Sequence, residues 1–307
     1  MYKKWAFVTI GAVFFLILVG GIVRATGSGM GCPDWPKCFG SWIPPTHVDQ
    51  LPVNYQEIFG AKLKGEVEFN VFKTWTEYVN RLVGVLIGFL IFGTFIAALI
   101  EYRSTNRKVI AYSLLAFVLV ALEGWLGSKV VSSELHVGLI TLHMLLAIAV
   151  VFSLIYSLYL AFEYKDLSTD NSGASKKFLV WILMILSFGQ LIMGTQIRES
   201  IDEIAREVLD RNEWIALLEG SYYVHIGLGI MLLLASIWFY RGSRNEFKGL
   251  SRVLLNTLLA LILFEFSSGL VLGVFGVPAW IQPIHLTLAT IILGIEFGLV
   301  LIIGKER

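Results

Sequence analysis

The sequence predicts an all-α membrane protein with eight transmembrane helices, arranged as two pseudo-symmetric four-helix bundles. Of the 307 residues, 56% are hydrophobic and only 15% are charged, and the mean hydropathy is +0.74. Eight apolar runs are long enough to cross a hydrocarbon core of about 30 Å, which takes roughly 20 residues of helix. An internal repeat is the third observation, because two similar apolar runs carry His143 and His285 at matching places.

The first half of the chain, 1–162, contains four of the predicted helices. The helix at Trp5–Val23 follows a basic N-terminal segment. Because its apolar run is longer than the roughly 7–15 residues of a signal peptide, we expect it to be retained. A loop at 24–74 holds both cysteines of the chain. The remaining helices of this half are predicted at Trp75–Ile100, Val109–Val131 and Gly138–Phe162.

A polar segment at 163–177 is the predicted linker between the halves, and the second half is 178–307. The helices of this half are predicted at Phe178–Gln196, Tyr222–Tyr240, Val253–Phe275 and Ile281–Ile303. Between the first two of these helices, residues 198–220 carry aliphatic side chains at helical spacing among charged ones. Two interpretations of that segment are open: an interfacial amphipathic helix, and a cover over the two helices that it joins.

Basic residues gather at one end of the predicted helices, at both termini and in the linkers 101–108, 163–177 and 241–252. By the positive-inside rule, this end is cytoplasmic. We therefore expect a multi-pass protein of a prokaryotic inner membrane, with both termini in the cytoplasm and the loop 24–74 outside. The net charge of +1 gives no reason to expect nucleic acid as a partner.

Four polar side chains are predicted at one depth near the outer ends of their helices: Asn80, His143, His225 and His285. Glu123 and Glu265 extend the repeat, because each precedes a histidine by 20 residues and a glycine follows each glutamate one turn later. We expect both glutamates to form interhelical hydrogen bonds. Ionisable side chains are costly in a membrane and usually mark function. A single histidine could simply bond to a neighbouring helix, but three at one depth favour a shared ligand.

Haem fits this set of side chains better than zinc does. Zinc sites draw three or four ligands together. A haem needs one or two imidazoles from facing helices and a large apolar cleft, which a helix bundle supplies. Arg24, Arg81 and Arg198 are predicted at the same end, where each could pair with a haem propionate or anchor its helix at the membrane interface. Both interpretations stay open for each arginine.

The remaining polar residues have less specific patterns. Glu77 lies one turn before Asn80, where it could act in acid–base catalysis, stabilise charge, or interact only with the helix dipole. Cys32 and Cys38 could form a structural disulfide, a redox pair or a pair of metal ligands, and a location outside the cytoplasm favours the disulfide. The other two histidines are expected to be ordinary loop residues: His47 and His136.

Four features of the sequence resemble the haem A synthase family. They are GGIVRATGSGMGCPDWPKC at Gly20–Cys38, TEYVNRLVG at Thr76–Gly84, LITLHMLLA at Leu139–Ala147 and the pair His225/His285. The resemblance extends over nearly the whole chain. It implies a membrane oxidoreductase of two four-helix halves that converts haem O to haem A for the terminal oxidase, by oxidising a ring methyl to a formyl group.

The resemblance also implies the places of two haems. His225 and His285 would hold a haem b cofactor in the second half of the chain. The first half would bind the substrate haem O, with His143 next to the iron and Glu77 as the essential glutamate of the family.

Three other positions of the first half enter the same comparison. Cys32 and Cys38 match the disulfide pair of the family's first loop. Asn80 departs from the family pattern E-x-x-H-R, in which a histidine stands at this place. Asparagine is a poor iron ligand, so a substrate haem held by His143 alone would keep an open position suited to oxygen activation. Alternatively, Asn80 indicates an altered activity.

The predicted function is therefore stepwise oxidation of haem O near the outer face, with electrons passing through haem b from a donor such as ferredoxin or quinol. Two alternatives from other classes stay open. One is a non-catalytic membrane b-type cytochrome, and the other is a haem carrier or assembly factor. Haem O synthase and a second copy of this chain are candidate protein partners within the lipid bilayer.

Overall fold

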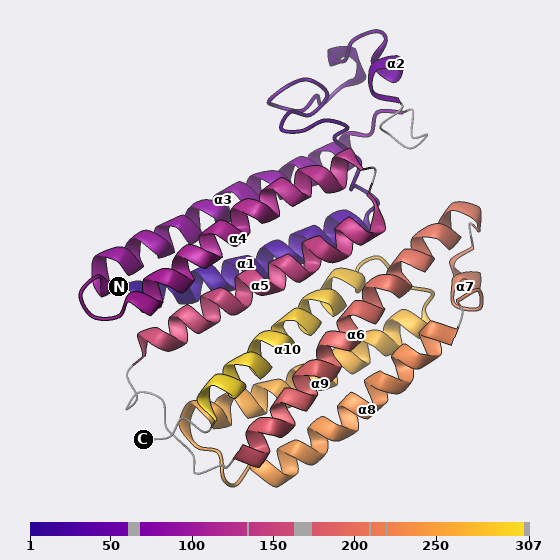
Figure 1. The fold of residues 1–307 in the computed structure, drawn as a ribbon. Coiled ribbons are helices and arrows are strands. Elements are labelled where there is room, and N and C mark those ends of the chain that lie inside the picture. Colours follow the sequence, from indigo (N-terminus) through magenta and orange to yellow (C-terminus); the bar gives the residue numbers. More distant parts are fainter. Residues whose placement is uncertain (61–67, 134, 163–173, 209, 219, 304–307) are drawn as a thin grey trace. The chain divides into compact units, whose positions relative to one another are not determined.

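The computed structural model describes residues 1–60, 68–133, 135–162, 174–208, 210–218 and 220–303. These residues form helices and connecting segments, with one isolated bridge between Cys38 and Ser41 and no β-strand. Among them, eight helices are long and apolar enough to cross a membrane. They are α1 (Tyr2–Ala25), α3 (Val71–Tyr102), α4 (Arg107–Ser132), α5 (Val137–Ala161), α6 (Ala174–Glu207), α8 (Gly220–Ser243), α9 (Gly249–Val274) and α10 (Gln282–Ile302) (Figure 1). The prediction of an all-α membrane protein with eight transmembrane helices is confirmed.

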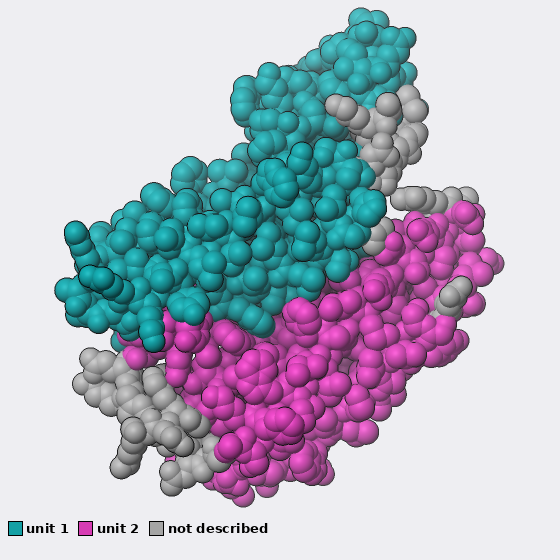
Figure 2. Space-filling model, viewed as in Figure 1, with its two compact units in different colours: residues 1–153 teal, residues 154–307 magenta. Residues whose placement is uncertain are grey.

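The chain forms two compact units, unit 1 at residues 1–153 and unit 2 at residues 154–307 (Figure 2). The boundary between them lies within α5, whereas the linker predicted from the sequence is 163–177. Residues 163–173 of that linker lie outside the described residues, and its last four residues belong to the first turn of α6.

In unit 1, α3 packs against both α1 and α4. The contact between α1 and α3 includes a buried hydrogen bond of 2.9 Å between the hydroxyls of Thr9 and Thr94. α5 is tied to α4 by Ser153, whose hydroxyl donates to the backbone carbonyl of Tyr112 at 2.9 Å. Such bonds hold helices together in lipid, where polar groups have no water to bind.

In unit 2, the four long helices form a closed ring. α6 packs against α8 and α10, and α9 packs against the same two helices. α8 and α10 therefore lie on opposite sides of the ring. The core is aliphatic and aromatic, and its buried side chains are Val180, Leu183, Leu232, Phe239, Phe247, Leu255, Leu258, Ile262, Ile292, Leu299, Val300 and Ile303.

α6 is longer than the sequence predicts. It continues to Glu207, past the expected end at Gln196, and the short helix α7 (Arg211–Trp214) follows it. Apolar side chains of this region pack together with Val277, which lies between α9 and α10: Ile197, Ile201, Trp214 and Leu218. Because these side chains pack against other parts of unit 2, the described part of the segment covers the helices that it joins, which agrees with the second interpretation.

α1 and α3 are joined by the first loop, residues 26–70, which includes the short helices η1 (Val48–Gln50) and α2 (Tyr55–Phe59). Cys32 and Cys38 form a disulfide in this loop, which confirms one of the three interpretations of the pair. The loop has a small core of buried side chains: Cys32, Cys38, Phe39, Leu51 and Phe59. Tyr78 of α3 packs against this core, so the loop is folded onto the start of α3.

Candidate functional site

The two histidines of the sequence repeat lie against glycines of neighbouring helices. A β-carbon placed on Gly127 of α4 would lie 3.4 Å from Cε1 of His143 of α5. One placed on Gly269 of α9 would lie 3.2 Å from Cε1 of His285 of α10. The absence of a side chain at these glycines lets each imidazole approach the backbone of the adjacent helix, as small residues do at membrane helix contacts.

The same arrangement occurs at the other two candidate ligands. A β-carbon on Gly194 of α6 would lie 3.5 Å from Cε1 of His225 of α8, and one on Gly20 of α1 would lie 4.0 Å from Oδ1 of Asn80 of α3. Each of the four contacts joins two consecutive long helices of one unit. Asn80 Oδ1 and His225 Nδ1 are buried, and among the described residues they have no hydrogen-bond partner.

The glutamates of the repeat reach the histidines that they precede. Glu123 Oε1 lies 3.2 Å from His143 Nδ1, and Glu265 Oε1 lies 3.2 Å from His285 Nδ1. Both contacts join neighbouring helices, but the one at His143 lacks hydrogen-bond geometry, so the interhelical hydrogen bonds expected for these carboxyl groups stay a prediction. One difference separates the two sites: Ser268 Oγ also lies 2.7 Å from His285 Nδ1.

Glu77 and Arg81, one turn apart on α3, contact the loop around the disulfide. The backbone N–H of Cys32 donates to Glu77 Oε2 at 2.8 Å, and Glu77 Oε1 forms an ion pair with Arg81. The Arg81 guanidinium also donates to three backbone carbonyls, those of Cys32 (3.2 Å), Asp34 (2.8 Å) and Lys37 (3.0 Å). Arg81 therefore clamps the disulfide loop to α3. The sequence gives no signal of this role beyond the one-turn spacing of the pair.

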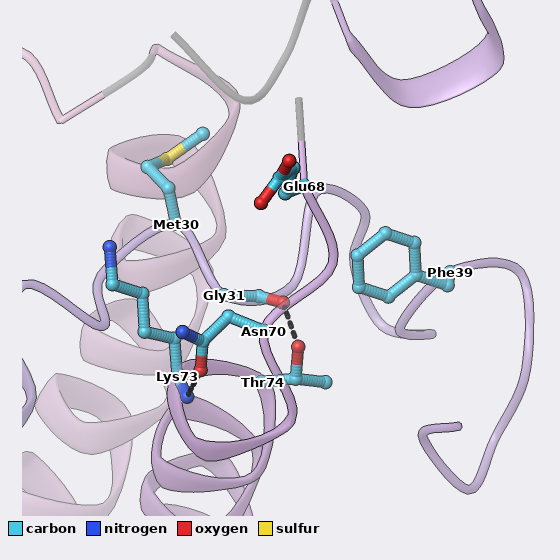
Figure 3. A pocket seen from close by; sticks show the side chains of 7 residues that line it. All are labelled: Met30, Gly31, Phe39, Glu68, Asn70, Lys73 and Thr74. Carbon is cyan, nitrogen blue, oxygen red and sulfur yellow. Dashed lines mark hydrogen bonds between the residues drawn. The ribbon is translucent and has the colours of Figure 1, made fainter. Parts of the chain in front are cut away.

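A small pocket marks the seam between the first loop and α3. Its lining residues are Met30, Gly31, Phe39, Glu68, Asn70, Lys73 and Thr74 (Figure 3). Thr74 Oγ1 donates to the carbonyl of Gly31 at 2.9 Å, and Asn70 Oδ1 caps α3 by accepting from the backbone N–H of Lys73 at 3.0 Å (Figure 3). A β-carbon on Gly31 would lie 2.3 Å from the Lys73 carbonyl oxygen, so this close approach needs glycine. None of the seven lining residues is a candidate haem ligand.

The remaining predicted residues are two arginines on long helices and two histidines in loops. Arg24 is in the last turn of α1, and Arg198 forms an ion pair with Asp202 within α6. His47 immediately precedes η1, and His136 immediately precedes α5. Both of these histidines lie in loops, as expected.

Sequence reasoning missed one buried acid, Glu296 of α10. Its side chain is fully buried, and Ser187 of α6 donates to Oε1 at 2.9 Å. Glu296 Oε2 has no hydrogen-bond partner within the part of the chain that the structure describes. A single acidic residue inside the last apolar run was the available signal.

Comparisons with known proteins agree with the resemblance noted in the sequence. The family model COX15-CtaA, described as "Cytochrome oxidase assembly protein", matches residues 3–296. "Heme A synthase" of Bartonella bacilliformis is 29% identical over 213 residues, covering 62% of this chain and 58% of that protein. "Heme A synthase" of Flavobacterium psychrophilum is 23% identical over 318 aligned positions, covering 92% and 91% of the two chains.

A third relative, "Heme A synthase" of Nitrosomonas eutropha, is 34% identical over 139 residues, which is 43% of this chain and 38% of that protein. The matched part thus spans less than two thirds of the Bartonella bacilliformis and Nitrosomonas eutropha proteins. It spans about nine tenths of the Flavobacterium psychrophilum protein. The family model, in contrast, covers nearly the whole sequence. On that match, the chain belongs to the COX15-CtaA family of cytochrome oxidase assembly proteins.

Proposed function

We propose that this chain is a haem A synthase, which oxidises a ring methyl of haem O to a formyl group and so provides haem A for the terminal oxidase. The family match and the names of the relatives support the proposal. The observation that carries it is the set of intramembrane histidines, each packed against a glycine of the neighbouring helix. Imidazoles held inside an apolar bundle are suited to haem iron.

We assign haem b to unit 2, between His225 and His285. These imidazoles come from α8 and α10, which lie across the closed ring from one another, and both would hold the iron of a haem bound inside the ring. The donor set fits haem better than a metal ion, because the described residues contain no group of three or more His, Cys, Asp or Glu side chains that could hold one. Haem b, when bound here, would supply one-electron transfer.

We assign the substrate haem O to unit 1, with His143 next to its iron and Asn80 as a second contact. Glu123 Oε1 lies 3.2 Å from His143 Nδ1, without the geometry of a hydrogen bond. The buried Oδ1 of Asn80 is able to accept a hydrogen bond from a bound group. Two imidazoles in unit 2 and one in unit 1 suit one site for electron transfer and one for chemistry.

Arg24 and Arg198 are the proposed partners of the haem propionates. Each lies one turn beyond the glycine that faces a candidate ligand, Gly20 and Gly194. A guanidinium has five N–H donors, so Arg198 can keep its ion pair with Asp202 and also bind a propionate. Arg81 already contacts the disulfide loop, and a propionate would have to share its donors.

Glu77 is the proposed proton-handling residue of the oxidation. Its carboxyl group is buried, and the N–H of Cys32 and the guanidinium of Arg81 fix both of its oxygens. A carboxylate held in one position can accept a proton from a reacting group with little reorganisation. His143 would act with it by holding the substrate.

The proposal includes the membrane context. Both termini would lie in the cytoplasm of a prokaryote, with the first loop and both haem sites toward the outer face of the inner membrane, because the basic residues gather at the opposite ends of the helices. Ferredoxin or quinol would serve as the electron donor. Haem O synthase and a second copy of this chain are the protein partners to test.

Asn80 favours one alternative function, a haem carrier or assembly factor without chemistry, because asparagine ligates iron poorly. A non-catalytic b-type cytochrome has less support. It would need two complete haem sites, and the candidate ligands provide only one pair of imidazoles.

Expression in bacteria that make haem O but no haem A separates these functions. Haems extracted from cells with the wild type and with Asn80→His are resolved by chromatography. Haem A from the wild type supports the proposed enzyme. If only the Asn80→His variant yields haem A, the natural chain has lost the activity. Haem b alone from both contradicts the proposal and favours a carrier or a cytochrome.

A further inference from the structure

His285 has one contact at Nδ1, with the hydroxyl of Ser268, that the other candidate ligands lack. Ser268 Oγ lies 2.7 Å from His285 Nδ1, and Glu265 Oε1 lies 3.2 Å from the same atom. Ser268 Oγ also lies 2.7 Å from the backbone carbonyl oxygen of Glu265, three residues earlier in α9, and donates to it. Two side-chain oxygens of α9, Ser268 Oγ and Glu265 Oε1, therefore lie next to Nδ1 at one edge of the imidazole.

Counting hydrogens assigns the tautomer of His285. A serine hydroxyl has a single hydrogen, and we assign that of Ser268 to the Glu265 carbonyl, which can only accept. Toward His285, Ser268 Oγ must therefore accept, so Nδ1 carries the ring hydrogen. The other tautomer would bring Glu265 Oε1 against a nitrogen lone pair and would leave the oxygens of Ser268 and Glu265 in contact without a hydrogen. With Nδ1 protonated, Nε2 presents its lone pair to a metal.

The matching position in unit 1 cannot make this contact. His143 and Glu123 correspond to His285 and Glu265 in the repeat, and Leu126 takes the place of Ser268. Leu126 is buried but apolar, and among the described residues His143 Nδ1 has no partner with hydrogen-bond geometry. The same holds for His225 Nδ1. The fixed Nδ1–H donor is a property of His285 alone among the three intramembrane histidines.

We propose that Ser268 is a positioning residue for haem b: its hydroxyl fixes His285 with Nε2 free for the iron and strengthens the imidazole as a donor. This inference rests on the proposed function. An acceptor at Nδ1–H shifts electron density into the ring and favours ferric over ferrous iron, as hydrogen-bond partners behind metal-bound histidines generally do. Ser268 thus lowers the reduction potential of haem b. Leu126 leaves His143 without this support, which suits a site that must release its haem.

The test is the reduction potential of haem b in the purified full-length protein. We expect Ser268→Ala to retain haem b and to shift its equilibrium toward the reduced form about tenfold, which is about 59 mV for a one-electron couple. Ser268→Thr keeps the hydroxyl and should retain the wild-type potential. Ser267→Ala is the matched control, because within the described residues its hydroxyl bonds to the Leu263 carbonyl of its own helix and to no other group.

An unchanged potential in Ser268→Ala with haem b bound would overturn the inference and leave the proposed function standing. If Ser268→Ala loses haem b, its reduction potential cannot be measured, and the test rests on Ser268→Thr. A reduction potential of haem b in Ser268→Thr that differs from the wild-type value would then contradict the role of the hydroxyl. A wild-type protein that binds no haem b would instead refute the proposed function, and the inference with it.

Discussion

The backbone N–H of Cys32 donates a 2.8 Å hydrogen bond to Oε2 of Glu77, which joins the disulfide loop to a buried carboxyl group of α3. Arg81, one turn later, contacts the other oxygen of Glu77 and three carbonyls of the same loop. The first loop and the candidate catalytic residue therefore form one hydrogen-bonded assembly. Within this assembly, a substitution of Glu77 should affect mainly the proposed chemistry. A substitution of Arg81 should affect mainly the attachment of the first loop to α3.

Glu77→Gln should keep the shape of the side chain and its bond from Cys32 but lose the proton-accepting carboxylate. We expect haem A formation to fall by about 10²-fold or more, since positioned acid–base groups contribute on that order. Haem b content should stay at the wild-type level, because Glu77 belongs to unit 1. Chromatography of the extracted haems measures both quantities, and an undiminished yield of haem A would refute the proton-handling role.

Arg81→Ala should release the first loop from α3. Hydrogen bonds to a charged group contribute about 1.5–3 kcal/mol each, and the three carbonyl contacts would be lost together. Limited proteolysis should then cut within 26–70 faster than in the wild type, whereas Arg107→Ala at the start of α4 serves as a control. Equal cleavage rates in Arg81→Ala and the control would show that the clamp contributes nothing to the stability of the loop.

Gly269→Ala should reduce the haem b content of the purified protein. The new β-carbon would lie 3.2 Å from Cε1 of His285, so the imidazole has to move away from α9. Gly84→Ala is the matched control, because nothing lies within 4 Å of the corresponding carbon there. Haem b content is read from the absorbance spectrum. If the two variants bind equal amounts of haem b, the close contact with Gly269 has no part in placing the ligand.

Glu296→Ala should lower the melting temperature of the protein in detergent. Removing the carboxyl leaves the Ser187 hydroxyl without its buried acceptor, which costs about 1–3 kcal/mol, and the lost volume adds to this. Glu296→Gln retains an oxygen acceptor for Ser187 and should be tolerated better. A melting temperature equally low in both variants would mean that the ionisable group itself is needed.

The apolar runs predict the transmembrane helices to within a few residues, because length and hydrophobicity alone determine which segments can cross a bilayer. α6 is the exception. The charged residues after Gln196 indicate an end to the helix, yet it continues to Glu207, since Ile197 and Ile201 pack against side chains from distant parts of unit 2. Such tertiary contacts override a local pattern and cannot be read from it.

The candidate site was predictable where the chain repeats itself. The equal spacing from Glu123 to His143 and from Glu265 to His285 predicts two similar contacts, and the structure has both at 3.2 Å. The clamp formed by Arg81 was not predictable, because the path of the first loop decides which carbonyls reach the guanidinium. The contact of Ser268 with His285 was also missed, since a serine beside a glycine in a membrane helix resembles an ordinary packing residue.

The central claim is that the two units have different tasks, with resident haem b in unit 2 and conversion of haem O in unit 1. Haem analysis of purified His143→Ala and His285→Ala, produced in cells that supply haem O, tests it most directly. His143→Ala should retain haem b and yield no haem A, whereas His285→Ala should lose haem b. Wild-type amounts of haem A from either variant, or loss of haem b from folded His143→Ala, would contradict this division of function.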